Sequence, residues 1–141
     1  MASILKVDAM QGVTAAGDIT ITSEGGAATQ SLQQGLAKSW INYDQASNVV
    51  RDSSNISSVV DNSTSEFETN FTNVTNNIYY SVYGSFNMNY SVAGALGYAM
   101  HTDGVAERTP TTSDFFVRTI NFSGSGYDAK YNMMSVHGDL A

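Results

Sequence analysis

Alternation of apolar and polar residues between turn-forming residues restricts the fold of this chain more than any other feature. In residues 66–71, the odd positions, which include Phe67 and Phe71, fall on one face of an extended strand, and polar even positions fall on the other. A turn-forming run, residues 61–65, precedes this segment. Residues 56–71 are therefore predicted to form an antiparallel hairpin with one buried and one solvated face.

Strand-like segments bounded by turn-forming residues recur along most of the chain. Six further segments, rich in β-branched or aromatic residues and bounded by turn formers, are predicted strands: residues 39–43, 55–61, 78–86, 90–100, 114–123 and 129–138. Together with residues 66–72 they give seven strands in about 100 residues, which suits an antiparallel β-sandwich or a compact barrel. We therefore expect an all-β fold for residues 35–141.

The charge balance excludes several classes of function. The formal net charge is −7, only 13% of residues are charged, and no basic cluster occurs. Phosphate backbones and anionic membrane surfaces would be repelled, so neither nucleic-acid binding nor membrane insertion is expected. With no cysteine in the chain, stability must come from the core or from oligomerisation.

Residues 1–34 differ from the rest and are predicted to be an extended N-terminal arm. Two short strand-like pieces, residues 3–8 and 18–22, are too short to fold alone and must lie on the chain, on a sister subunit or on another protein. Residues 28–37 are the one plausible helical stretch, of at most two turns. The expected attachment residues of the arm are Ile4, Leu5, Val7, Ile19 and Ile21.

Two of the predicted strands carry aromatic residues on both faces. In residues 78–86, Tyr79 and Tyr83 lie opposite an apolar set. In residues 114–123 the second face holds Phe116, Ile120 and Phe122. We interpret these surplus faces as an oligomer interface, and the alternative is a second sheet of the same subunit packed on them.

No catalytic motif is present, and we expect neither an enzyme nor a bound cofactor or metal. The two histidines, His101 and His137, fit solvated loop or strand-end positions better than a metal or acid-base site. Trp40 with Tyr43, or the tyrosines Tyr79, Tyr83 and Tyr90, could stack on sugar rings, although core or interface packing is the alternative.

Several segments of the chain carry a family resemblance. Residues 35–43 (GLAKSWINY), 50–58 (VRDSSNISS) leading into 66–73, 116–119 (FVRT) and 135–139 (SVHGD) resemble a small module of tail-fibre-like and other virion structural proteins of tailed bacteriophages, especially marine ones. The opening residues 3–8 (SILKVD) resemble the N-terminal starts of those proteins.

The resemblance implies a β-rich, commonly trimeric virion protein whose N-terminal arm attaches to the particle and whose C-terminal domain faces outward. We therefore expect a short fibre, knob or decoration protein located in the virion, with itself, as a homotrimer, and other virion proteins as partners. The alternative is a tip protein that binds a host-surface glycan or receptor through loops that include residues 100–112. A polysaccharide depolymerase would need two carboxylates in a groove, and no convincing pair occurs.

Overall fold

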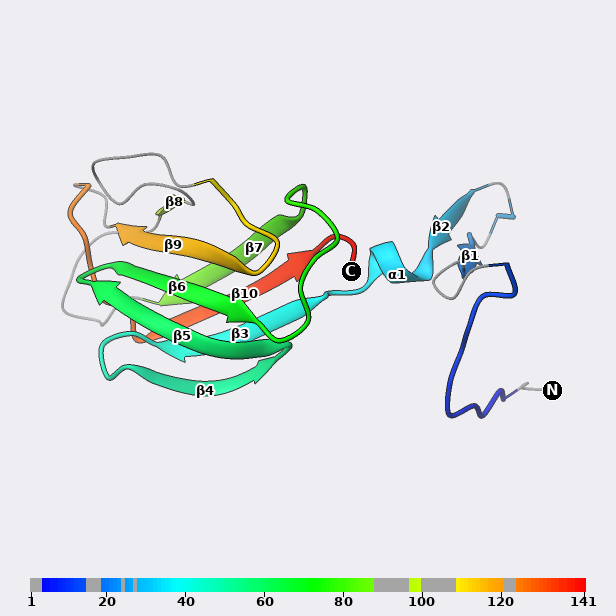
Figure 1. Cartoon of the computed structure of the whole chain (residues 1–141), viewed down its shortest axis with the longest axis horizontal. Helices are drawn as coiled ribbons and strands as arrows, with labels where there is room; N and C mark the ends of the chain where they lie inside the picture. Colours follow the sequence, from blue (N-terminus) through cyan, green and yellow to red (C-terminus); the bar gives the residue numbers. More distant parts are fainter. Residues whose placement is uncertain are drawn as a thin grey trace. The chain divides into compact units, whose positions relative to one another are not determined.

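The chain is built mainly of antiparallel β-strands, as its alternation predicts (Figure 1). This computed structural model describes residues 4–14, 19–23, 25–26, 28–87, 97–99, 109–120 and 124–141. The chain divides into two compact units, Met1–Leu36 and Ala37–Ala141, which are described separately below.

The first sheet of the larger unit has the strand order β4-β3-β10-β7. It consists of β3 (Ser39–Asp44), β4 (Val49–Ser54), β7 (Ser81–Asn87) and β10 (Tyr131–His137). All neighbouring strands are antiparallel. The C-terminal strand β10 therefore lies between strands from the beginning and the middle of the unit.

The second sheet has the order β5-β6-β9-β8 and is also antiparallel. Its strands are β5 (Ile56–Ser63), β6 (Glu66–Phe71), β8 (Gly97–Ala99) and β9 (Asp114–Ile120). Pairing of β5 with β6 confirms the predicted hairpin. Along β6, Phe67, Thr69 and Phe71 are buried while the intervening polar residues are half-buried, which confirms the alternation.

The apolar faces of the two sheets share one core, and Figure 1 shows the sheets as two layers. The ring of Tyr43 on β3 packs 4.9 Å from that of Phe67 on β6, between centroids. Phe71 lies 5.6 Å from Phe115 and 5.8 Å, edge to face, from Tyr80. Such pairs add to the free energy gained from burial alone. The buried core cluster comprises Ile41, Tyr43, Phe67, Phe71, Tyr80, Phe115, Val117, Met134 and Val136.

A single residue, Asn55, separates the end of β4 in one sheet from the start of β5 in the other. Its φ of 57° is a left-handed conformation that asparagine tolerates better than most residues. Its Nδ2 donates to the carbonyls of Lys38 and Asn73, both at 3.0 Å, and its Oδ1 accepts from the Asn73 amide at 2.7 Å. The side chain thus joins three backbone segments where the chain changes sheets.

Strand β4 contains a bulge that places an extra residue in its pairing with β3. Asn42 pairs with Asp52 and Tyr43 with Val50, so that Arg51 has no partner in the ladder. The bulge shifts the face on which later residues of β4 lie. This strand was not predicted, because a bulge and a short polar sequence together hide a period of two.

The smaller unit contains a two-stranded antiparallel sheet, β1 (Thr20–Thr22) with β2 (Thr29–Ser31), and a one-turn helix, α1 (Leu32–Gly35). Ser31 caps α1, since its hydroxyl accepts a hydrogen bond from the Gln34 amide. None of the described residues in this unit is buried.

The predicted segment boundaries need correction at several places. Residues 4–8 are not a strand, and residues 29–31, which were predicted to be helical, form β2 instead, because pairing with β1 outweighs a weak helix tendency interrupted by Gly35. Of the predicted strand at residues 90–100, the described part is β8. The last three residues of the segment 114–123 lie outside the described residues.

Replacement of Asn55 by alanine tests its role in the turn between the sheets. Alanine loses three hydrogen bonds and is strained at a positive φ, so Asn55→Ala is expected to lower the free energy of unfolding by about 2–4 kcal/mol. Urea denaturation followed by circular dichroism measures this change. Asn55→Gly keeps the backbone conformation without the side-chain bonds and should fall between the two. An alanine variant as stable as the parent would contradict this role.

Two buried tyrosines predict how stability falls at alkaline pH. Burial, reinforced by the carboxylates of Asp61, Asp128 and Asp44, raises the pKa of Tyr43 from 10.0 to about 12, and burial beside Asp114 does the same for Tyr80. Both phenols are neutral below pH 10 in either state, so stability is fully present there.

As the pH rises from about 10 towards 12, the unfolded chain releases these two protons more readily than the folded chain, and stability should fall. Urea denaturation across this range measures the loss. The double variant Tyr43→Phe, Tyr80→Phe should show a shallower dependence on pH. An equally steep dependence in that variant would show that other groups cause the loss.

Candidate functional site

The residues expected to attach the N-terminal arm lie on its surface. Ile4 and Leu5 are about four-fifths exposed, at 79% and 80%, and Val7 and Ile21 are also exposed. Ile19 is half-buried, and its carbonyl accepts a hydrogen bond from the Leu32 amide. None of these five side chains is therefore buried in a core of its own unit.

The five residues expected in an oligomer interface do not share one surface. Tyr79 and Tyr83 are 87% and 77% exposed. Phe116 is only 3% exposed, so this chain already covers it, and its assignment to a contact between copies is wrong. Ile120 is half-buried at the end of β9, and Phe122 lies outside the described residues.

Among the aromatic residues considered for sugar stacking, Trp40 and Tyr83 line the same surface groove. Tyr43 is fully buried in the core, because it occupies the inward face of β3 while Trp40 occupies the outward face. The pairing of Trp40 with Tyr43 is therefore wrong. Tyr90 lies outside the described residues.

Strand register brings Trp40 and Tyr83 into one row across the outer face of the first sheet. Ser135 on β10 pairs with Trp40 on β3 on one side and with Tyr83 on β7 on the other. The next row along the strands is Asn42, Met133 and Ser85, in which Met133 is the central residue. Six side chains thus form a grid of two rows on three adjacent strands.

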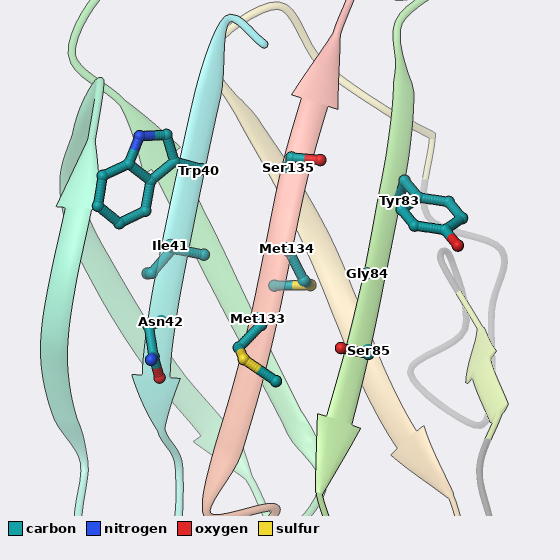
Figure 2. Close-up of a pocket in the computed structure, with 9 residues that line it drawn as sticks. All are labelled: Trp40, Ile41, Asn42, Tyr83, Gly84, Ser85, Met133, Met134 and Ser135. Carbon is teal, nitrogen blue, oxygen red and sulfur yellow. The ribbon is translucent and has the colours of Figure 1, made fainter.

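This grid encloses a shallow groove of about 370 Å³, which we call the β10 groove (Figure 2). In Figure 2, Ser135 and Met133 form its floor on β10, the indole ring of Trp40 lies at one margin and the ring of Tyr83 at the other. Both rings lean away from β10 and leave the floor open. The groove is lined by Trp40, Ile41, Asn42, Tyr83, Gly84, Ser85, Met133, Met134 and Ser135.

Gly84 allows β7 to lie close to β10 beneath the groove. A Cβ atom there would lie 2.7 Å from both the Met133 carbonyl oxygen and Cγ of Met134, closer than any normal contact. A larger residue would separate the two strands that carry Tyr83 and Ser135. Gly84 therefore permits the close approach of β7 and β10 on which the groove is built.

The lining of the groove is neutral. None of its nine residues is acidic or basic. Its polar side-chain groups are those of Asn42, Ser85 and Ser135, the phenol of Tyr83 and the indole N–H of Trp40. Oδ1 of Asn42 is buried and has no hydrogen-bond partner among the described residues. A buried acceptor without a partner carries a desolvation cost. The groove thus offers neutral donors and acceptors between two aromatic rings.

Arg51 is occupied by interactions within the same sheet and leaves the groove without a cation. Its Nη2 lies 2.5 Å from Oδ2 of Asp44, and its Nη1 donates to the carbonyl of Lys130. The guanidinium also stacks over the ring of Tyr131, 4.1 Å from its centroid. The bulge in β4 therefore places Arg51 where it ties β4, β3 and β10 together.

The titratable residues considered in the sequence do not gather into a metal site among the described residues. No group of three or more histidine, aspartate or glutamate side chains there could hold a metal ion. His137 is half-buried at the end of β10, paired with Ser81, and His101 lies outside the described residues. No helix in the described ranges is long and apolar enough to cross a membrane.

Sequence reasoning missed Met133, Ser135 and Asn42 as members of the groove. Met133 and Ser135 lie two residues apart on β10, and Asn42 lies two residues from Trp40 on β3. The outward face of each strand could therefore be predicted from its alternation. The pairing of β10 with both β3 and β7 joins segments about 90 and 50 residues apart, and local pattern carries no signal for it.

Comparisons with protein-family models, with curated proteins and with solved structures found no match.

Proposed function

We propose that this protein is a non-catalytic structural component of a tailed-phage virion, a short fibre, knob or decoration protein. Its N-terminal arm attaches to the particle, and its larger unit, a β-sandwich, faces outward. The proposal is supported by the resemblance of residues 35–43, 50–58 and 66–73 to virion modules and by the surface of the arm.

The observation that carries the proposal is a row of exposed apolar side chains near the start of the N-terminal unit. Ile4, Leu5, Val7, Met10 and Val13 are all exposed, in a stretch without helix or strand. Because burial of each such side chain is worth roughly 1.5–3 kcal/mol, a partner surface would gain substantially by covering them. An extended segment can also pair with an unpaired sheet edge of another virion chain.

We further propose that the protein forms homotrimers. A core shared by two small sheets without disulfides favours association, and Tyr79 supplies an exposed aromatic side chain for it. A trimer with its three larger units at the particle surface, related by one threefold axis, would expose three copies of the same outer face.

Substitution of the apolar residues tests attachment. The triple variant Ile4→Asp, Leu5→Asp, Val7→Asp should be lost from purified particles, measured by mass spectrometry, because charged side chains cannot be buried in the partner surface. Its thermal stability should match that of the parent, since these residues are exposed. Val74→Asp, at another exposed valine, is the control and should be incorporated normally. Normal incorporation of the triple variant would contradict the attachment role.

Light scattering coupled to size exclusion tests the trimer. The parent should give a mass near three times that of one chain, and Tyr79→Ser should shift the population towards single chains by removing an interface ring. Val60→Ser, at an exposed position on β5, should leave the mass unchanged. A monomeric parent protein would contradict the trimer.

A second candidate function is favoured by the β10 groove. A tip protein that contacts a host-surface glycan needs an open, neutral surface with aromatic rings, and the groove between Trp40 and Tyr83 has these properties. The two functions are compatible, because attachment uses the N-terminal unit and recognition would use the larger unit.

A further inference from the structure

We infer that the β10 groove is a binding site for a neutral oligosaccharide, held between Trp40 and Tyr83. This inference rests on the second candidate function and specifies its ligand class and contact residues. It is independent of whether the arm attaches to a virion.

Aromatic side chains at both margins provide the apolar contacts. The C–H faces of a pyranose ring carry partial positive charge and pack on the negative face of an aromatic ring. Trp40 is 40% exposed and Tyr83 77% exposed, so both rings can be reached by a ligand. Figure 2 shows the indole spread face-on beside β3. Two such rings on one surface give a sugar chain two stacking positions.

The spacing of the rings favours a chain of sugars over a single one. Trp40 and Tyr83 belong to the same row and are separated by β10, so their Cα atoms lie two strand spacings apart, roughly 9–10 Å. Both rings lean away from β10, as Figure 2 shows. A chain running across the strands from β3 to β7 would contact both.

Short polar side chains along this path supply hydrogen bonds. Ser135 lies in the row between the two rings, and Asn42 and Ser85 flank Met133 in the next row. Oδ1 of Asn42 has no partner among the described residues, so a small rotation of its amide would present an acceptor or a donor to a hydroxyl. Sugar hydroxyls both donate and accept, which matches this mixed set. The Met133 thioether offers an adaptable apolar floor.

Charge selects a neutral ligand. The groove has no cationic side chain, Arg51 is paired with Asp44, and Asp52 pairs with Asn42 beside the groove. A uronate or sulfated sugar would find no charge-assisted partner and would meet a chain of net charge −7. Single-stranded nucleic acid, whose bases also stack on aromatic rings, is disfavoured for the same reason.

Contact between copies of this chain is the competing use of Tyr83. The register assigns Tyr83 to the row of Trp40 and Ser135, and a self-contact over this row would close the groove. The oligomeric state of variants of Tyr83 separates the two uses.

The experiment uses the intact protein and a panel of neutral and anionic oligosaccharides. Trp40 is the only tryptophan of the chain, so its emission reports directly on the groove. A neutral oligosaccharide, such as a gluco-, manno- or galacto-oligosaccharide, should shift this emission and bind in isothermal titration calorimetry. Oligogalacturonate and sulfated oligosaccharides should bind at least about tenfold more weakly, since a tenfold difference corresponds to only about 1.4 kcal/mol.

Matched variants assign the binding to the groove. Trp40→Ala and Tyr83→Ala should each weaken binding at least about tenfold, as the loss of one stacking partner does for nucleic-acid bases. Val60→Ala, at an exposed position on β5 in the other sheet, should leave binding unchanged. Trp40→Phe keeps an aromatic ring and should bind more tightly than Trp40→Ala. This comparison shows that the weaker binding of Trp40→Ala comes from loss of the ring and not from misfolding.

Three results would overturn the inference: no neutral sugar of the panel binds, Val60→Ala weakens binding as much as Tyr83→Ala, or Tyr83→Ala converts an oligomer into single chains. The second would place the site elsewhere, and the third would place Tyr83 in a contact between copies. Incorporation of Trp40→Ala into particles is measured in parallel, so failure of the groove and failure of virion attachment are distinguished.

Discussion

The core of the larger unit forms where an apolar face of one sheet packs against an apolar face of the other. The contact of Tyr43 with Phe67 spans the two layers, and the rings of Phe71, Phe115 and Tyr80 continue it. Because successive residues of a strand point to opposite faces, turning Tyr43 inward turns Trp40 and Asn42 outward. The outer surface of the first sheet is thus a consequence of the core, and the groove exists because the core determines the register of three strands.

Much of the fold could be predicted from local pattern, and the exceptions have physical causes. The hairpin of β5 and β6 was predictable because period-two alternation and a turn signal agree there. Strand β4 was not, since its bulge at Arg51 and the one-residue passage at Asn55 interrupt both signals. Phe116 has the sequence pattern of a surplus face, yet its burial depends on what packs over β9, which a single strand does not reveal.

The groove was less predictable than the fold. The outward positions of Tyr79 and Tyr83 followed from the alternation of residues 78–86, whereas Trp40 was considered for stacking together with Tyr43, which lies in the core. The position of Trp40 in one row with Tyr83 depends on β10 lying between β3 and β7, a pairing over long sequence distances. Attachment through the N-terminal unit was suggested by sequence resemblance and exposed side chains. The β10 groove became visible only through the register of three strands.

The bulge in β4 also affects how the first sheet can grow. As the terminal strand in the order β4-β3-β10-β7, β4 presents an edge to which strands of other molecules could add. Arg51 and Asp52, two of the few charged residues in this chain, stand on that edge beside the irregular step. A bulge and charged side chains on an edge strand disfavour edge-to-edge pairing with strands of other molecules.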